Sequence, residues 1–527
     1  MADLLSVNEA SQWATEYLDR KVTMSNISYL IQYGRVPKIS ENGTTQVKKS
    51  DLIDYYKKFN CTKEERWKDK LGQDLNWALS FAEYKESETT KHVHRLHPYK
   101  GKFIPQLVEY FLDDHTDKFK KGVFFRKGDT VLDPFCGSGT TLVQANELGI
   151  NAIGADVSAF NALISNVKVL KYDLDDIEQT LNKITEKLKV FISSRNNTAF
   201  ENHLLDELKH FNNRYFPSPE FKLKVRSKEI NDKFYGPEKS AEFLPTFEKL
   251  IKKYHIQLHQ KNTKGFLDNW FIQEIRDEID FVFNEVKNIK YATTKQIASI
   301  ILSRTIRSCR ATTHSDLGTL VKPQTTTYYC KKHGKICKPL FSIYSWWLRY
   351  SKDTLKRLKH FDELRTDTKQ ICLTGDSRTL DLFEEISKRD REFGKSILDR
   401  KIDGIFSSPP YVGLINYHEQ HAYSYDLFGF ERQDKFEIGP LYKGQGREAR
   451  ENYAQGIANV LNNCKKYLKP NYNVFLVAND KYGLYPSIAE MAEMKIINQY
   501  KRPVLNRVEK DRSAYAEIIF HLKDGNQ

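Results

Sequence analysis

Two stretches far apart in the chain carry residue types that could do chemistry. The first, DPFCGSGTT, begins at Asp133, and the second, SPPY, runs from Ser408 to Tyr411. In the first, Gly137 and Gly139 let the backbone approach a ligand where a Cβ atom would clash. The second puts two prolines at the end of a buried strand, where each removes a backbone donor and fixes φ. Such placement indicates a rigid functional loop, although a plain Pro-Pro terminator before a core tyrosine fits that stretch alone.

The glycine-containing stretch reads as a strand, a ligand-binding turn and a helix. Thr140 and Thr141 open the helix, whose first amides face the turn. The stretch has neither the Gly-Lys-Ser/Thr of a Walker loop nor the G-x-G-x-x-G of a dinucleotide fold. The next strand, NAIGAD, ends at Asp156, where a carboxylate is placed to accept hydrogen bonds from ribose hydroxyls. Asp156 could also cap the following helix, and the two roles are compatible.

The elements that must position these motifs form an interrupted α/β pattern. Strands such as QICLTGDSR, DGIFSSPPY, NVFLVAND and AEIIFHLK alternate with helices, including one stopped by Pro470, which predicts a mainly parallel, doubly wound sheet. The predicted units are a small N-terminal domain over 1–60, a helical connector over 61–90, a first α/β half over 91–172, a largely helical insertion over 173–344, and a second α/β half over 345–527.

The N-terminal unit has a distinct pattern of its own. NEASQWATEYL and TMSNISYLIQYG predict two helices, the second capped by Thr23 or Ser25 and ended by Gly34. A hairpin turning at Asn42-Gly43 and a closing helix follow. This succession resembles the winged-helix modules of excisionase- and MerR-type DNA-binding proteins. A docking domain without DNA contacts is the alternative.

Taken together, DPFCGSGTT and SPPY resemble the amino-methyltransferases of DNA, which use S-adenosylmethionine. HPYKGKFIPQLV, starting at His97, is similar to a further cofactor motif of that family. The resemblance covers about residues 91–172 and 345–522 and implies a Rossmann-like class I methyltransferase sheet.

The resemblance also implies a set of cofactor-binding residues. It puts Asp133 and the turn from Phe135 to Gly139 at the methionine side, with Lys102 and Phe103 helping to hold that end. It puts Asp156 at the ribose and Asp376 near the adenine. The implied set is Lys102, Phe103, Asp133, Pro134, Phe135, Cys136, Gly137, Ser138, Gly139, Thr140, Asp156 and Asp376.

For SPPY, the resemblance implies methyl transfer to the exocyclic amine of a flipped base. The amine is a weak nucleophile, and Ser408 and the carbonyl of Pro409 could accept its hydrogen bonds while Pro410 keeps the loop rigid. Tyr411 offers a ring on which the base can stack. Within the family SPPY is more often seen with cytosine N4, and DPPY or NPPY with adenine N6, so we expect cytosine N4.

Three alternatives to that function stay open: adenine-N6 transfer to DNA, methylation of an RNA base, and a non-catalytic winged-helix regulator. As a DNA methyltransferase, the protein would be the modification partner of a restriction enzyme or of another defence system.

The insertion contains a basic segment that we expect to contact DNA. SRTIRSCRATTHSDLG supplies arginines and hydroxyls that can contact phosphates or base edges, although a solvated basic helix end is an equal alternative. The predicted contacts, with Thr313 as a further hydroxyl, are Arg304, Arg307, Arg310, Thr312 and His314.

A cysteine–histidine cluster follows in YYCKKHGKICKP. Cys330, His333 and Cys337 could supply three zinc ligands, with Cys309 or His314 as the fourth. Because only one cluster with a non-standard spacing is present, we expect no metal and read the cysteines as free buried thiols on a hairpin.

Composition agrees with a nucleic-acid partner. Among 527 residues, 83 Lys and Arg against 69 Asp and Glu give a net charge of +14, and double-stranded DNA is the polyanion we expect. No apolar run approaches the ~18 residues of a membrane span, and the N-terminus lacks a signal core, so we expect a cytoplasmic protein. Seven cysteines do not indicate a disulfide framework.

Overall fold

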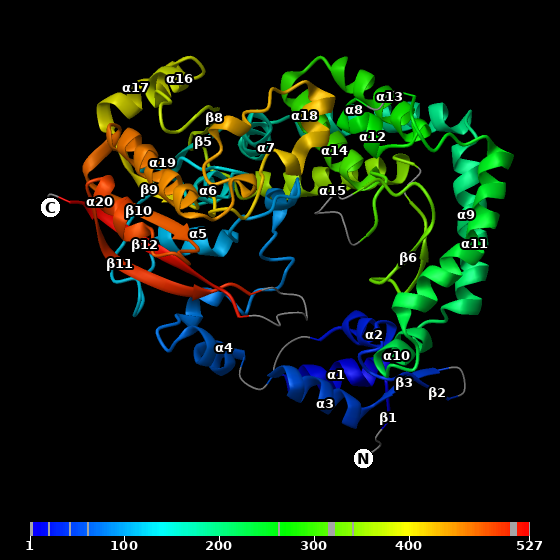
Figure 1. Cartoon of the computed structure of the whole chain (residues 1–527). Helices are drawn as coiled ribbons and strands as arrows, with labels where there is room; N and C mark the ends of the chain where they lie inside the picture. The colour runs from blue at the N-terminus through cyan, green and yellow to red at the C-terminus, as the bar shows by residue number, and fades with distance from the viewer. Residues whose placement is uncertain are drawn as a thin grey trace.

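A computed structural model describes residues 4–18, 22–41, 44–60, 63–261, 264–314, 322–339, 342–505 and 514–525 (Figure 1). A seven-stranded sheet has the order β11-β12-β10-β9-β4-β5-β8, and only β12 runs antiparallel to its neighbours. Its strands are β4 (Thr130–Asp133), β5 (Asn151–Asp156), β8 (Gln370–Thr374), β9 (Ile402–Ser407), β10 (Leu468–Ala478), β11 (Met494–Pro503) and β12 (Ala516–Asp524). The Rossmann-like methyltransferase sheet implied by the resemblance is confirmed.

Consecutive strand residues send their side chains to two separate apolar cores, one on each face of the sheet. Phe406 and Phe475 enter one core, and Ile405 and Leu476 enter the other. Because both faces are covered, the central strands β4 and β9 are buried along nearly their whole length rather than alternating between buried and exposed residues. The covering helices are α5 (Pro105–Leu112), α6 (Thr140–Glu147), α7 (Ala159–Val169), α16 (Leu382–Ser387), α17 (Arg391–Arg400), α19 (Arg447–Lys465) and α20 (Tyr485–Met491).

The insertion is largely helical, as predicted, but it shares a core with the sheet. Ile177 and Trp347 belong to the same apolar cluster as Phe160 beside the sheet, and the Trp347 indole donates to Thr185 Oγ1 at 3.0 Å. Its elements are α8 (Leu174–Ser193), α9 (Asn197–Tyr215), α10 (Glu220–Arg226), α11 (Asp232–Tyr254), α12 (Phe266–Trp270), α13 (Gln273–Lys287), α14 (Ala292–Cys309), β6 (Tyr328–Cys330) and β7 (Lys335–Cys337), and α15 (Tyr344–Asp362) follows it.

The N-terminal unit has its own small core and a three-stranded sheet of order β1-β3-β2. Thr23 caps its second helix, as one of the two predicted caps. The predicted turn at Asn42-Gly43 lies outside the described residues, and strand β1 was not predicted. The elements are β1 (Leu4–Ser6), α1 (Val7–Tyr17), α2 (Met24–Gln32), β2 (Ile39–Glu41), β3 (Thr44–Lys48) and α3 (Lys49–Asn60). The predicted order of helix, helix, hairpin and helix is confirmed; DNA binding by this unit stays a prediction.

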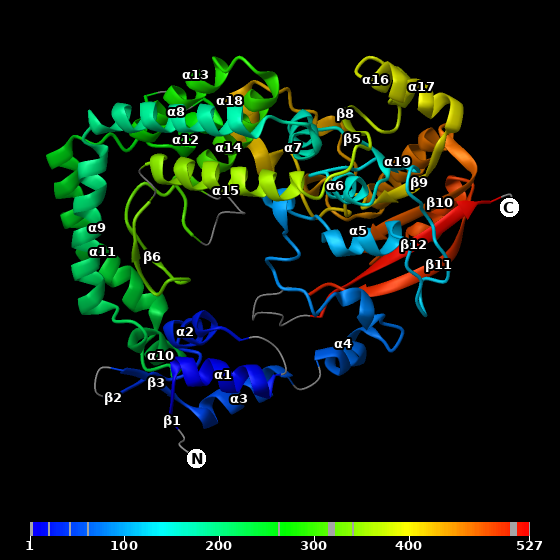
Figure 2. The same cartoon turned by 180° about the vertical axis from the view of Figure 1, so that it is seen from behind.

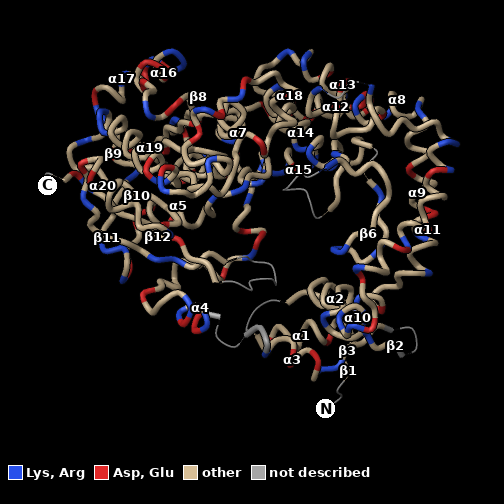
Figure 3. Tube along the Cα trace, viewed as in Figure 1, with Lys and Arg blue, Asp and Glu red and all other residues tan. Residues whose placement is uncertain are grey.

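The units are arranged in an arc (Figures 1 and 2). Helices α9 and α11 form an arm that leads away from the sheet to α10, which meets the N-terminal unit. There Arg226 donates to the carbonyl of Gly34, and the Lys222 ammonium lies 4.2 Å from the centre of the Tyr33 ring. The Lys and Arg positions are spread along the chain around the whole arc rather than gathered in one unit (Figure 3).

Three predicted elements differ from the structure. The connector contains α4 (Lys63–Leu71) and a short 3-10 turn, Trp77–Ser80, which lies against β11; the chain from there to residue 90 has no regular helix. The helix predicted over DLFEEISKRDREF is divided into α16 and α17, because Asp390 caps a new helix. Pro470 does not stop α19, which ends at Lys465, but lies inside β10. No helix in the described part of the chain is long and apolar enough to cross a bilayer.

Candidate cofactor and substrate site

The turn after β4 has a conformation that favours glycine at two positions. Gly137 has φ of +52°, and a Cβ atom on it would lie 2.9 Å from the hydroxyl oxygen of Tyr99. Gly139 has φ of +75°, and its Cβ would lie 2.9 Å from the side chain of Ser165. Both substitutions would therefore combine backbone strain with a collision. The turn leads directly into α6, whose first amides face it.

Asp156, at the end of β5, ties this turn to the next helix. Its carboxylate accepts from the Gly137 amide at 2.9 Å, from the Ser158 amide at 2.8 Å and from the Asn161 side chain at 3.1 Å. Burial raises the pKa of Asp156 to about 6 against these donors. The N-cap of α7 is Ser158, whose hydroxyl accepts from the Asn161 amide at 3.2 Å. Asp156 is therefore not the cap itself.

Asp133 connects the glycine turn to the strand that carries SPPY. Its carboxylate accepts from the Ser407 hydroxyl and, at 3.2 Å, from the Phe135 amide. Burial raises the pKa of Asp133 to about 6. Because β4 and β9 are adjacent parallel strands, their carboxyl ends meet at one edge of the sheet, and this bond joins the two motifs there.

One cavity at this edge brings the two motifs together. Of the predicted cofactor-binding residues, all but Gly139 line it, and so do Ser408 and Pro410. Pro409 is buried beside them. The cavity therefore unites motifs that are more than two hundred residues apart in the chain.

Several lining residues were not predicted: Tyr99, Ser158, Asn161, Tyr417, His418 and Glu437. Tyr99 and Tyr417 stack with ring centres 6.3 Å apart. Two of the six could have been predicted from the sequence: Tyr99 lies inside the upstream motif, and Asn161 follows Asp156 by five residues. No motif in the sequence indicated Glu437, which is hydrogen-bonded to His418.

Two predicted cofactor residues have their charged groups engaged by the protein. The Lys102 ammonium donates to the His94 carbonyl at 2.8 Å, and burial lowers its pKa to about 8. Asp376 pairs with the Arg378 guanidinium, with one contact of 2.7 Å. Both residues line the cavity; the charge of Asp376 is paired with a guanidinium, whereas the hydrogen bond of Lys102 goes to a neutral carbonyl.

The SPPY loop is tied to two neighbouring strands. The Ser408 hydroxyl donates to the Val477 carbonyl of β10 at 3.0 Å. The Tyr411 hydroxyl donates to Glu517 of β12 at 2.7 Å, and burial raises its pKa well above the usual value. The hydroxyl protons of both residues are therefore committed, which leaves the lone pairs of Ser408 Oγ as acceptors at the cavity.

The structure buries three of the predicted DNA contacts of the insertion. Arg304 is 8% exposed and pairs with Asp353 at 2.7 Å. Arg310 is 2% exposed and lies over the Tyr423 ring at 5.2 Å. These guanidinium groups hold the protein together and do not face solvent. Thr312 is also buried, whereas Arg307 is partly exposed and stays a predicted contact.

The cysteine-containing hairpin is confirmed as β6 and β7. His314, the remaining predicted DNA contact, lies instead beside Cys330, His333 and Cys337. Cys309 lies apart from this group and contacts the Ser342 carbonyl at 3.7 Å.

Known proteins are similar to this chain, one of them over nearly its whole length. A family model described as DNA methylase matches residues 19–166. The type II methyltransferase M.MjaII of Methanocaldococcus jannaschii is 43% identical over 524 residues, which cover 99% of this chain and 97% of that protein. The type II methyltransferase M.BsoBI of Geobacillus stearothermophilus is 31% identical over 103 residues, 19% of each chain. A tRNA (guanine(10)-N2)-dimethyltransferase of M. jannaschii is 31% identical over 81 residues, 13% of this chain and 23% of that one.

Proposed function

The chain belongs to the type II amino-methyltransferases of DNA, the N4/N6 family, and on that basis we propose that it methylates cytosine N4 at a specific DNA sequence. S-adenosyl-L-methionine is the methyl donor of this family. Cytosine is proposed over adenine because the acceptor loop reads SPPY, and the restriction-modification role is proposed with it.

The cavity fits such a cofactor by the polar atoms it leaves unsatisfied. Ser138 Oγ, Asn161 Oδ1 and Glu437 Oε2 are buried, line the cavity and have no hydrogen-bond partner among the described residues. Buried polar atoms of this kind are normally satisfied, so a polar ligand is expected to meet them. A Cβ at Gly137 would intrude on Tyr99 in the same wall.

Different parts of the cavity would hold different parts of the cofactor. We assign Asp156 to the ribose hydroxyls, because its carboxylate is fixed by three N–H donors and keeps acceptor capacity. We assign the Asp133 turn, Lys102 and Phe103 to the methionine end, and Asp376 to the neighbourhood of the adenine. When bound there, S-adenosyl-L-methionine supplies an electrophilic methyl group on a sulfonium.

The observation that carries the proposal is the state of the Ser408 hydroxyl. Its proton is directed at the Val477 carbonyl, so the oxygen can act only as an acceptor toward the cavity that it lines. An exocyclic amine needs acceptors, because its lone pair is delocalised into the ring until its N–H bonds are polarised. Ser408 Oγ and the Pro409 carbonyl accept those bonds and localise the lone pair on nitrogen.

The prolines and Tyr411 serve to position the base. Since φ is fixed at Pro409 and Pro410, the acceptors need no ordering when the base arrives. We assign the Tyr411 ring, anchored at its hydroxyl by Glu517, to stacking on the flipped base.

The direct test is to identify the methylated nucleoside. Labelled S-adenosyl-L-methionine is offered with unmethylated genomic DNA and with total RNA, and the digested nucleosides are identified by mass, with Ser408→Ala as the matched enzyme control. We expect N4-methylcytosine in DNA only. N6-methyladenine would overturn the base assignment. Label in RNA alone would favour the RNA alternative, and label in neither would favour the non-catalytic regulator.

A further inference from the structure

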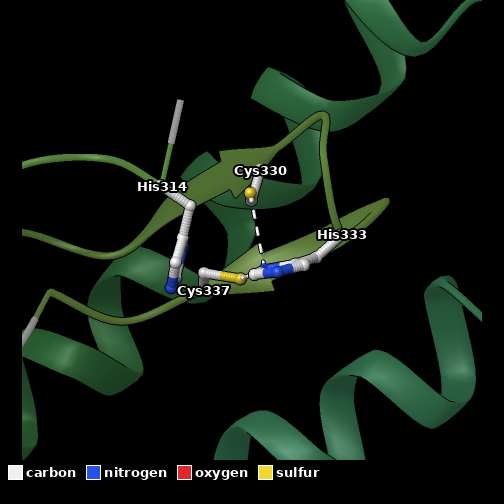
Figure 4. A group of neighbouring side chains, drawn as sticks. All are labelled: His314, Cys330, His333 and Cys337. Carbon is white, nitrogen blue, oxygen red and sulfur yellow. Dashed lines mark hydrogen bonds between the residues drawn. The ribbon is translucent and has the colours of Figure 1, made fainter. Parts of the chain in front are cut away.

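Four potential metal ligands converge on one small hairpin outside the methyltransferase site (Figure 4). Cys330 lies on β6, Cys337 on β7, His333 in the turn between them, and His314 in the segment after α14. One ligand atom from each lies within 4.8 Å of the other three. Cys330 and Cys337 are 1% and 7% exposed, and none of the four residues lines the cofactor cavity.

The distances within this group match a tetrahedral zinc site. With Zn–S of about 2.3 Å and Zn–N of about 2.0–2.1 Å, tetrahedral geometry separates a sulfur and a nitrogen ligand by about 3.6 Å. His333 Nδ1 lies 3.6 Å from Cys330 Sγ and 3.4 Å from Cys337 Sγ. The rings of His314 and His333 have centres 4.4 Å apart and a 67° angle between them. In Figure 4 the four side chains point toward one another.

A neighbouring tyrosine orients His314 in the way that outer-shell groups orient metal-bound histidines. The Tyr328 hydroxyl lies 2.7 Å from His314 Nδ1 and accepts from the His314 amide at 3.0 Å. With Nδ1 engaged, Nε2 is the ring atom left to coordinate.

We propose that His314, Cys330, His333 and Cys337 bind one Zn²⁺ in a closed structural site. Two thiolates and two imidazoles complete a tetrahedral shell and leave no open position for water or substrate, which distinguishes a structural from a catalytic zinc.

A metal would crosslink the side of the hairpin that the main core does not hold. Each strand has three residues; Ile336 packs into the main core and Tyr329 against it, whereas Tyr328, Cys330 and Cys337 form a separate small cluster. Metal binding contributes directly to folding free energy, so a bound zinc would stabilise this second side.

The site would also fix the arm that carries the N-terminal unit. Asn212 of α9 exchanges two hydrogen bonds of 2.9 Å with the backbone of Ile336. A Cβ on Gly334, in the turn, would meet Lys222 at 3.0 Å, and Lys222 in turn covers Tyr33 of the N-terminal unit. A metal that holds the hairpin therefore holds the end of the arm.

The test is metal analysis of the full-length protein, expressed without a metal-binding tag and purified without chelator. We expect about one zinc per chain by plasma mass spectrometry. After exchange into cobalt(II), we expect the absorption bands of a tetrahedral thiolate site. Zinc-free protein that also fails to bind cobalt would overturn the proposal.

Variants separate this ligand set from a general effect on folding. Cys330→Ser, Cys337→Ser and His314→Ala should each lose bound zinc, while Cys309→Ser, which removes a buried thiol outside the group, should keep it. Loss of zinc from Cys309→Ser with retention in His314→Ala would contradict the assignment. For wild type, adding a chelator should increase proteolytic cleavage at the hairpin while cofactor binding persists; unchanged cleavage would contradict the structural role.

Discussion

At the scale of single residues, the site depends on carboxylates that are kept out of water. Burial raises the pKa of Asp133 and of Asp156 to about 6 from a usual value of 3.8. The ionised form that a ribose hydroxyl requires is therefore maintained only by nearby N–H and O–H donors. The position of each acid thus depends on the turn that supplies those donors.

This raised pKa predicts pH-dependent cofactor binding. In the free protein Asp156 is protonated below about pH 6 and then loses acceptor capacity. Affinity for S-adenosyl-L-methionine should be constant above pH 7 and fall as pH drops through 6, to roughly a tenth at pH 5. Calorimetric titration from pH 5 to 8 checks this. Asp156→Asn should bind weakly throughout and show a flatter profile; equal wild-type affinity at pH 5 and 8 would contradict the assignment.

The acceptor role of Ser408 predicts a selective loss of turnover. Ser408→Ala removes a fixed acceptor from the cavity, so methyl transfer should slow by roughly 100-fold. Cofactor affinity should stay within about twofold, because the residues assigned to the cofactor are unchanged. Ser299→Ala is the matched control, since Ser299 also donates to a backbone carbonyl, at 2.8 Å, but lies in α14 outside the cavity. Wild-type turnover by Ser408→Ala would disprove the acceptor role.

At the scale of elements, glycines with a positive φ differ in what a side chain at their position would contact. Gly137 and Gly149 both have positive φ, +52° and +74°. A Cβ on Gly137 would meet Tyr99 at 2.9 Å, whereas one on Gly149 would lie 3.5 Å from Lys127, an ordinary contact. Substituting each glycine by alanine therefore distinguishes the effect of backbone strain, which both share, from intrusion into the cavity wall, which only Gly137 would cause.

Both alanine variants should lose about 1–2 kcal/mol of stability from the left-handed backbone. Only Gly137→Ala should also weaken cofactor binding, by at least about tenfold, because Tyr99 must move. Thermal unfolding and cofactor titration of the pair provide the measurement. Equal cofactor affinity in the two variants would show that the turn does not shape the site.

The sequence predicted the buried elements better than the exposed ones. β4, β5 and β9 are short, mainly apolar runs that end at or directly before predicted site residues, and all three were found. β11 was missed because it is an edge strand, exposed along much of its length and paired only with β12, so MKIINQYKRP has no clear alternation. Pro470 was predicted to stop a helix but lies inside β10. The register of β10 against β9 shifts between Leu468 and Asn473, and a strand tolerates proline at such an irregularity.

For the site as well, local sequence patterns predicted some residues and missed others. Residues inside the predicted motifs lie around one cavity, where their roles stay a prediction, but Glu437 reaches it through a loop without regular periodicity. Arg304 and Arg310 were predicted to contact DNA because they lie in a basic segment. In the structure they are buried against Asp353 and Tyr423, which are distant in the sequence. His314, also predicted to contact DNA, lies beside Cys330 and Cys337 because of tertiary packing. Pairings of this kind depend on tertiary packing.

At the scale of the whole molecule, the arc places the N-terminal unit at the far end of the arm from the sheet (Figure 1). The unit has a separate core of its own. It meets the arm through Gly34 and Tyr33, which contact Arg226 and Lys222 of α10. A unit held in this way can contact a long substrate without altering the cofactor cavity.

The proposed DNA-binding role of this unit predicts how its removal would act. A chain lacking residues 1–60 should bind S-adenosyl-L-methionine normally, because none of those residues lines the cavity. It should bind DNA roughly tenfold more weakly, with a shallower dependence of affinity on salt, since fewer phosphates are neutralised. Fluorescence anisotropy across a salt series measures both quantities. Arg226→Ala in the full chain loosens the docking contact and should produce a smaller loss of the same kind. If the truncated chain keeps the affinity and salt slope of the full chain, the unit is a docking module for another protein, and the DNA contacts must come from the sheet edge and the insertion.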